Sequence, residues 1–184
     1  MILTPTLWRT CRVLGSPTRL RLLRHIVRLD RACVQQLGDL ENLSEPRASQ
    51  ELRRLQARGL VRAERDGRYV FYRPSPDPKV PSARPILEAA KLALENHPDD
   101  ETVRLAWAFG NQRRLDILYA LQAGPCDYEI LNMRVDMPIN TMSRHLQILA
   151  DNGLVVRQDK IWRLGKVTHP LTKAMLKLIK AKEA

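Results

Sequence analysis

The chain has 184 residues and carries 31 Lys and Arg against 20 Asp and Glu, which gives a formal net charge of +11. This positive charge suits a polyanionic partner, either nucleic acid or an anionic membrane surface. The sequence contains no run of 18 apolar residues and residues 1–12 do not form a secretion signal, which excludes a membrane-spanning helix and predicts a cytoplasmic protein.

Three helices are predicted in the first third of the chain. Residues 18–29 carry leucines at helical spacing behind a Ser-Pro pair, and both residues of that pair favour the start of a helix. Residues 34–40 form a second, shorter helix, and a Pro-containing break leads into a third helix over residues 47–58. Two helices joined by a tight turn are typical of a helix-turn-helix motif.

The third of these helices has one apolar and one polar face. Ala48, Leu52 and Leu55 recur at positions i, i+4 and i+7, which predicts a buried stripe. The polar side chains then point into solvent. Those that we expect to contact DNA are Arg47, Ser49, Gln50, Arg53 and Arg54. A basic exposed face on the second helix of a helix-turn-helix motif is suited to the major groove of DNA.

A β-hairpin is predicted to follow this helix. Residues 60–65 and 68–73 lie on either side of Asp66-Gly67, a dipeptide that favours a two-residue turn. Along this hairpin, or wing, Arg65, Arg68 and Arg73 are candidates for contacts with the phosphates of DNA. Residues 83–95 then form an amphipathic helix.

The second half of the chain repeats this plan. Residues 14–23 align with residues 109–118 at an offset of 95, and two later motifs recur at an offset of 94. This period matches a small domain and is longer than a solenoid repeat, so we predict two domains, residues 1–97 and 98–184. The first half is the more basic of the two, with a formal charge of +8 against +3.

In the second domain we predict helices over residues 114–122, 128–133 and 140–151, strands flanking Asp159-Lys160, and a last helix over residues 171–182. Met142, Leu146 and Leu149 form the buried stripe of the third helix. The residues expected to contact DNA are Asn140, Thr141, Ser143, Arg144 and His145 on that helix, and Lys160 and Arg163 on the hairpin.

The ordered motifs resemble those of the ArsR-type winged helix-turn-helix regulators. They are Ser44, Pro46, Ser49, Leu52 and Gly59-Leu60-Val61 in the first domain, and Ser143-Arg144-His145-Leu146 in the second. The resemblance implies a mainly α fold, with one α+β winged helix-turn-helix in each domain. Family members act as homodimers joined by their first and last helices, so a tandem copy implies a pseudo-twofold pair within one chain. Whether two chains form a further homodimer is left open.

Neither a metal nor a cofactor is indicated by the sequence. Many ArsR-type proteins sense metals through a cysteine pair before the recognition helix, whereas Cys33 and Cys126 each lack a second thiol at that place. We also expect no cluster of acidic residues and histidines on the last helices, and no partner for His25 or His169 at ligand spacing. A lone Cys33 or Cys126 is either a thiol sensor or a small core residue. No set of residues predicts an enzyme.

These features together predict a transcriptional regulator, acting as a repressor, that binds double-stranded DNA sequence-specifically through two unlike recognition helices in successive major grooves. Two alternatives stay open: a winged helix module for protein interaction, and an architectural DNA binder without sequence preference. No membrane partner is expected. The operator, the controlled genes and the effector ligand are not indicated.

Overall fold

Helices and short antiparallel strands make up the computed structural model, which describes residues 7–180. The first half contains α1 (Leu7–Arg12), α2 (Pro17–Leu29), β1 (Ala32–Cys33), α3 (Val34–Leu40), α4 (Glu45–Gln56), β2 (Arg62–Asp66), β3 (Tyr69–Arg73) and α5 (Ala83–Asn96). The second half contains α6 (Asp99–Phe109), α7 (Gln112–Gln122), α8 (Tyr128–Val135), α9 (Ile139–Asp151), β4 (Val155–Gln158), β5 (Ile161–Leu164) and α10 (Pro170–Lys180). No helix within residues 7–180 has the length and apolar character needed to cross a bilayer.

The helices and hairpins predicted from the sequence are confirmed to within a few residues. The elements α1, α6 and β1 are additional to the prediction. Residues 181 and 182 of the predicted last helix lie outside the described residues. The helix positions were predictable because each helix carries its own apolar stripe, whereas β1 is two residues long and is defined only by its pairing with β3.

The two hairpins differ in their turns. In the first, Asp66 pairs with Tyr69, so the turn is formed by Gly67 and Arg68, one residue later than predicted. Gly67 has a φ of 58°, which glycine adopts without a steric penalty. In the second, the turn falls on Asp159 and Lys160 as predicted, and both have positive φ, 48° and 68°.

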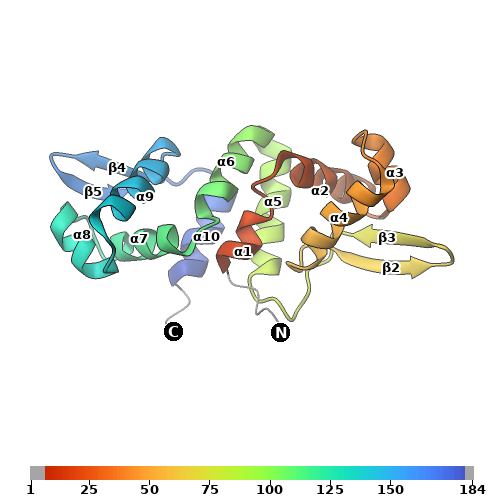
Figure 1. Cartoon of the computed structure of the whole chain (residues 1–184), viewed down its shortest axis with the longest axis horizontal. Coiled ribbons are helices and arrows are strands. Elements are labelled where there is room, and N and C mark those ends of the chain that lie inside the picture. Colours follow the sequence, from red (N-terminus) through yellow and green to blue (C-terminus); the bar gives the residue numbers. More distant parts are fainter. Residues whose placement is uncertain (1–6, 181–184) are drawn as a thin grey trace.

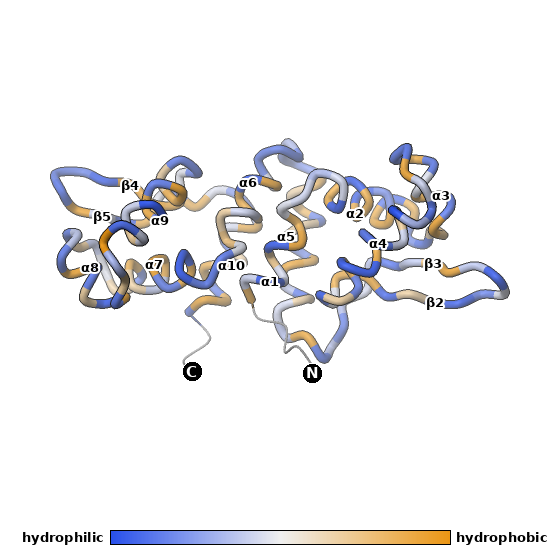
Figure 2. The backbone as a smooth tube through the Cα atoms, viewed as in Figure 1, coloured by the Kyte–Doolittle hydropathy of each residue, from blue (hydrophilic) through white to orange (hydrophobic). Residues whose placement is uncertain are grey.

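Four helices, α1, α5, α6 and α10, lie together in the middle of the molecule, and we call them the central layer (Figure 1). On one side lies the first head, residues 17–73, and on the other the second head, residues 112–164 (Figure 1). The buried side chains form one continuous apolar cluster that includes both heads and the central layer. The tips of both hairpins, by contrast, are hydrophilic (Figure 2).

Two glycines allow α1 and α6 to approach each other closely within the central layer. A Cβ on Gly15 would lie 3.0 Å from the backbone of Trp107, and a Cβ on Gly110 would lie 2.7 Å from the Cβ of Arg12. Gly15 therefore lies against Trp107, three positions before Gly110, and Gly110 lies against Arg12, three positions before Gly15. The contact is reciprocal, and it leaves no room for a side chain at either position.

We predict that Gly110→Ala lowers the free energy of unfolding by about 1–3 kcal/mol, because the new methyl group would overlap Arg12 in a packed contact. Urea denaturation followed by circular dichroism measures the change. Lys79→Ala, at an exposed position, is the control and should leave the midpoint almost unchanged. Equal stability of the Gly110→Ala variant and the wild type would contradict the close approach of α1 and α6.

Candidate nucleic-acid interface

Helix α4 is built as an amphipathic helix at the surface of the first head. Ser44 stands at its N-cap with an extended backbone, and Pro46 lies in its first turn, where the missing N–H is not needed. Ala48, Leu52 and Leu55 are fully buried, as the predicted stripe requires. The opposite face of α4 is therefore turned towards solvent.

The predicted contact residues of α4 lie on this outer face. Arg47, Gln50, Arg53 and Arg54 are exposed, and Ser49 is half-buried. All five line one shallow hollow along the helix, together with Ser44, Pro46 and Ala57. A row of guanidinium, amide and hydroxyl groups on one open face can donate to base edges and to phosphate oxygens.

A buried carboxylate, Glu51, holds three arginines at this surface and was not predicted to have a role. Its side chain is 2% exposed. One of its oxygens accepts from Arg19 of α2 at 3.0 Å, and the other lies 2.8 Å from Arg54 and 3.3 Å from Arg47. Glu51 thus ties α4 to α2 and fixes two of the exposed arginines.

The charge of Glu51 is maintained by these partners. Burial alone raises the pKa of its carboxyl group, but the hydrogen bonds from Arg19 and Arg54 outweigh burial and hold the pKa below its usual 4.5. The spacing Arg47-Glu51-Arg54 places both arginines within one turn of the glutamate, so this part of the cluster was visible in the sequence. The contact of Arg19 with Glu51 could not be seen in the sequence, because the two residues are 32 positions apart.

The first hairpin adds positive charge beside α4. Arg65 and Arg68 are exposed, and Arg68 donates to the hydroxyl of Tyr69 at 2.8 Å. Arg73 is different, because it pairs with Glu64 at 3.1 Å and with Asp30 at 3.4 Å. Arg73 therefore stabilises the hairpin within the protein, whereas Arg65 and Arg68 remain available to a ligand.

A hollow of about 500 Å³ lies between α4 and this hairpin. Ser49 and Arg53 line it from the helix, and Arg68 and Tyr69 line it from the hairpin. The helix and the wing of the first head therefore share one concave, mainly polar surface.

Helix α9 occupies the corresponding place in the second head. Met142, Leu146 and Leu149 are buried, again as predicted. The predicted contact residues divide into two groups by exposure: Asn140, Ser143 and Arg144 are exposed, whereas Thr141 and His145 are half-buried. Because Arg144 is the only Arg or Lys in Ile139–Asp151, this helix is far less basic than α4.

His145 lies on the side of α9 that faces the protein. Its Nδ1 is buried and has no hydrogen-bond partner among the described residues. Burial lowers the pKa of this imidazole, and the nearby charges of Arg114, Arg144 and Arg113 lower it further. His145 is therefore a neutral side chain at neutral pH and adds no positive charge to the surface of α9.

The surroundings of α9 include both basic and apolar exposed side chains. Lys160 and Arg163 are exposed on the second hairpin. Near the beginning of α9, Ile139 is 65% exposed and Met133 is 74% exposed. The hydroxyl of Tyr128 donates to the carbonyl of Ile139 at 2.9 Å and lies 3.3 Å from the hydroxyl of Ser143.

The two cysteines that the sequence leaves as either thiol sensors or small core residues are in unlike settings. Cys33 is half-buried at the N-cap of α3, where its sulfur accepts from the backbone N–H of Gln36 at 3.5 Å. Cys126 is buried, and burial raises the pKa of its thiol against the opposing charge of Arg134. A reactive cysteine needs a lowered pKa, so Cys126 lacks the property on which a thiol sensor depends.

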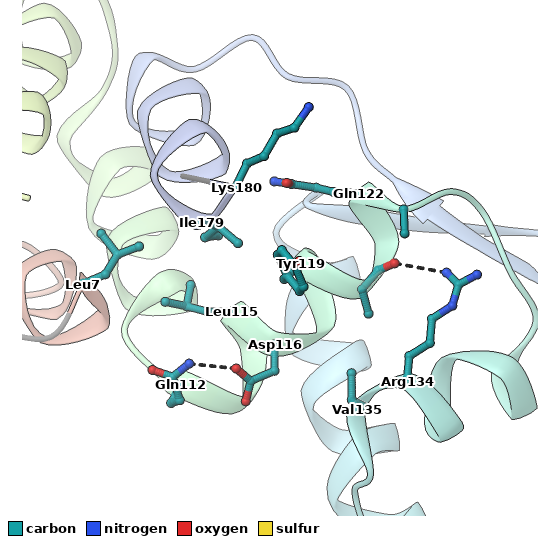
Figure 3. Close-up of a pocket in the computed structure, with 12 residues that line it drawn as sticks. Leu7, Gln112, Leu115, Asp116, Tyr119, Gln122, Arg134, Val135, Ile179 and Lys180 are labelled. Atoms are coloured by element: carbon teal, nitrogen blue, oxygen red, sulfur yellow. Dashed lines mark hydrogen bonds between the residues drawn. The ribbon is translucent and has the colours of Figure 1, made fainter. Parts of the chain in front are cut away.

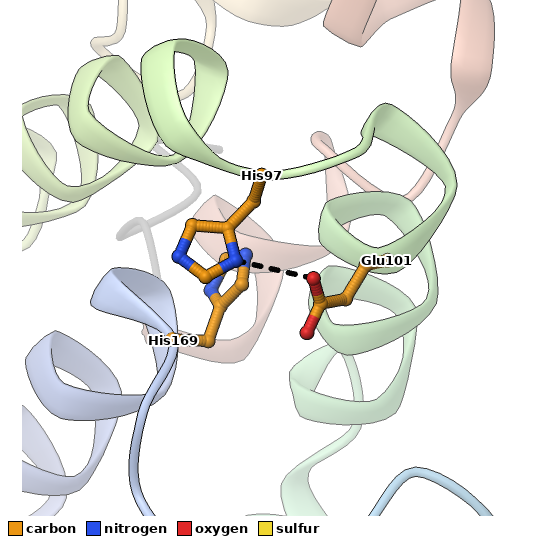
Figure 4. Close-up of side chains that lie close together, drawn as sticks. All are labelled: His97, Glu101 and His169. Carbon is orange, nitrogen blue, oxygen red and sulfur yellow. Dashed lines mark hydrogen bonds and ion pairs between the residues drawn. The ribbon is translucent and has the colours of Figure 1, made fainter.

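The expectation that His25 and His169 have no partner at ligand spacing is wrong. His25 lies 2.9 Å from a carboxylate oxygen of Glu41. His169 lies against the ring of His97, which in turn contacts Glu101 (Figure 4). The sequence concealed the second group because His97 and His169 belong to different halves of the chain.

A cleft of about 900 Å³ has no lining residue from α4 or α9, and Figure 3 shows the side chains that line it. It is lined mainly by α7, the end of α8 and α10, with Leu7 of α1 at its edge. Gln112 donates to Asp116 at 2.7 Å within it, and Arg134 donates to the carbonyl of Ala120 at its far side. These internal hydrogen bonds satisfy part of the polar lining, whereas the buried Oε1 of Gln122 has no hydrogen-bond partner among the described residues.

Several curated proteins are similar to part of this chain. The HTH-type transcriptional repressor SmtB of Mycobacterium tuberculosis is 39% identical over 62 residues, which are 34% of this chain and 45% of that protein. The arsenic resistance transcriptional regulator ArsR1 of Pseudomonas putida is 36% identical over 76 residues, 41% of this chain and 58% of that protein. A probable mercury resistance operon repressor of Streptomyces lividans is 40% identical over 91 residues, 48% of this chain and 67% of that protein.

The chain spans about half the length of the curated relatives that it matches. No family model matches it, and no solved structure matches it.

We predict that Glu51→Gln lowers the free energy of unfolding at pH 7 by about 1–3 kcal/mol, because three arginines lose a charged, buried partner. The pKa of Glu51 is lower in the folded than in the unfolded chain, so its contribution is present above about pH 4.5 and is lost as the pH falls below that value. Urea titrations between pH 7 and pH 3.5 measure both effects. The gap between the wild type and the variant should narrow as the pH falls, and a gap that stays constant would contradict the assignment.

Proposed function

Because the chain belongs to the ArsR-type helix-turn-helix regulators, we propose that it is a transcriptional repressor that binds double-stranded DNA with α4 and α9 as its two reading helices. The observation that carries this proposal is the outer face of α4, where four exposed polar side chains lie beside a basic hairpin. The formal charge of +11 supports the same partner. Such a regulator acts in the cytoplasm without a membrane or an enzymatic cofactor.

The arginines of α4 keep donors for DNA although they contact Glu51. A guanidinium has five N–H donors, and Arg47 uses its Nε on Glu51 while Arg54 uses one Nη. The remaining N–H groups can make a bidentate contact with guanine, which contributes roughly 1–3 kcal/mol of discrimination. Gln50 can make the corresponding contact with adenine, and Arg65 and Arg68 would contact phosphates.

The two halves, residues 1–97 and 98–184, are proposed to be duplicated domains related by a pseudo-twofold axis. The reciprocal contacts of Gly15 and Gly110, which are 95 residues apart, support this relation, because a twofold interface joins the same surface from both partners. A second pair of contacts has the same offset: the Nε of Arg19 donates to the carbonyl of Val13, and the Nε of Arg114 donates to that of Ala108.

The two reading helices would contact unlike half-sites. Helix α4 presents Arg47, Arg53 and Arg54, whereas α9 presents Asn140, Ser143 and a single arginine, Arg144. In helix-turn-helix proteins, paired reading helices contact half-sites about 34–36 Å apart, one helical turn of DNA. One chain would therefore bind an asymmetric site, and the first half-site would contribute more of the electrostatic affinity.

An alternative for the second head is protein docking, and it rests on the exposure of Ile139 and Met133 beside α9. Exposed apolar side chains of this size are more usual at protein interfaces than on DNA. Under this alternative, Arg144 would not affect DNA sequence preference, whereas Arg47 still would. An architectural DNA binder has no sequence preference, so neither substitution would change one.

We predict that selection from random DNA duplexes at fixed salt yields a site with two unlike half-sites, and that Arg47→Ala and Arg144→Ala each relax the preference in a different one. Each substitution should weaken binding to the selected site by roughly 1–3 kcal/mol, the contribution of one base contact. Fluorescence anisotropy with the selected duplex measures the change.

Arg84→Ala is the matched control, because Arg84 is an exposed arginine on α5, outside both heads. Recovery of no preferred sequence would overturn the proposal of a specific regulator. If Arg47→Ala relaxes the sequence preference and Arg144→Ala does not, the proposal that α9 is a second reading helix is overturned. The docking alternative for the second head is then favoured.

A further inference from the structure

A hollow of about 350 Å³ lies between α1 and the end of α4, and we call it the arginine hollow. Five of the eight residues that line it are arginines: Arg9, Arg12, Arg19, Arg54 and Arg58. They come from α1, α2, the last turn of α4 and the turn that follows it. No Asp or Glu of the described part of the chain lines this hollow.

The protein leaves three of these arginines without an acidic partner. Glu51 pairs with the two that lie nearest to it on α2 and α4, whereas the side chains of Arg9, Arg12 and Arg58 form no hydrogen bond or ion pair with residues 7–180. Residues 1–29 contain no Asp or Glu at all. Burial lowers the pKa of the Arg58 guanidinium, and the charge of Arg9 lowers it further. The hollow therefore holds positive charges that repel one another.

An aromatic ring positions two of the unpaired arginines. The guanidinium carbons of Arg9 and Arg12 lie 5.0 Å and 6.0 Å from the ring centroid of Trp8, which lines the same hollow. The face of an indole ring attracts a cation but carries no net charge. Trp8 therefore holds these guanidinium groups in place without neutralising them, and their N–H donors stay available to an acceptor.

The shared plan of the two halves does not require this concentration of charge. Under the proposed duplication, the offset of 94 residues puts Ile148 and Asn152 at the places of Arg54 and Arg58. Helix α9 nevertheless has the same buried stripe as α4. The arginines are thus an addition to the first half, as expected of side chains that bind a ligand.

We propose that the arginine hollow binds one phosphate group, and that the backbone of the DNA contacted by α4 supplies it. The inference rests on the proposed DNA-binding function for the source of the phosphate. Guanidinium groups are suited to phosphate because each presents several N–H donors in one plane to its oxygens. Five such groups around one small hollow can surround a single phosphate.

The position of the hollow favours DNA as the source. Arg54 and Ala57 line both this hollow and the one along the outer face of α4, so the two are continuous. A helix in the major groove is flanked by the phosphates of both strands. Along the long axis of the molecule, α1 lies between α4 and α9 (Figure 1). The bound phosphate would therefore belong to the DNA between the two half-sites, where neither reading helix contacts bases.

The first arm of the experiment measures DNA binding by the full chain, with the wild type and the double variant Arg9→Ala/Arg58→Ala. Fluorescence anisotropy follows two duplexes of unrelated sequence over a range of salt concentrations. We expect roughly tenfold weaker binding to both duplexes, because a phosphate contact carries no sequence information. The slope of log K against log salt should decrease by about 0.9, the value for one phosphate. Arg9→Lys/Arg58→Lys keeps both charges and should keep the slope.

The second arm measures a free phosphate compound. Inorganic pyrophosphate, compared with sodium chloride at equal ionic strength, should raise the thermal unfolding midpoint of the wild type but not that of the double alanine variant. An effect of the substitutions in this arm alone would support the phosphate site and assign it to a free compound instead of DNA. If the wild type binds no duplex, the proposed function fails, and the pyrophosphate arm alone decides the fate of the hollow.

Arg28→Ala is the matched control, because Arg28 is an exposed arginine of the first head that lines neither hollow. It should leave the salt slope and the pyrophosphate effect unchanged. The double alanine variant should unfold in urea at nearly the same midpoint as the wild type, since neither arginine forms an ion pair within residues 7–180. Unchanged binding in both arms would overturn the proposal, as would an equal loss in Arg28→Ala.

Discussion

The packing of α5 against α10 and of α1 against α6 is the interaction on which the rest of the structure depends. The buried apolar side chains of these four helices belong to one continuous cluster, which also includes the cores of both heads. The glycines at positions 15 and 110 allow the closest of these contacts. Because both heads are attached to the central layer, its packing sets where α4 and α9 lie relative to each other (Figure 1).

The first head uses the same charges for folding and for its surface. Glu51 is an acidic residue on a helix proposed to approach DNA, which is unfavourable if the carboxylate faces the phosphates. Its burial beneath Arg19, Arg47 and Arg54 removes this problem, because the arginines shield the carboxylate while their other N–H groups face outward. A basic surface is thus positioned by one acidic group.

The two halves share a plan and differ in chemistry. Helix α9 has one arginine where α4 has three, and apolar side chains lie exposed at its start. The cluster of His97, Glu101 and His169 lies between the halves, at the break between α5 and α6. Duplicated elements that diverge in this way can bind different ligands while keeping the contacts that hold them together.

The sequence by itself determined the helices other than α1 and α6, the two hairpins and the outward faces of α4 and α9, because each depends on periodicity and turn preferences among neighbouring residues. It placed Arg47, Gln50, Arg53 and Arg144 at exposed positions correctly, since the buried stripe of a helix defines its opposite face. Only the tertiary structure decided that Arg19 reaches Glu51 and that His97 meets His169. Those contacts join residues far apart in the chain, and they follow from how the helices pack, which no local pattern of residues encodes.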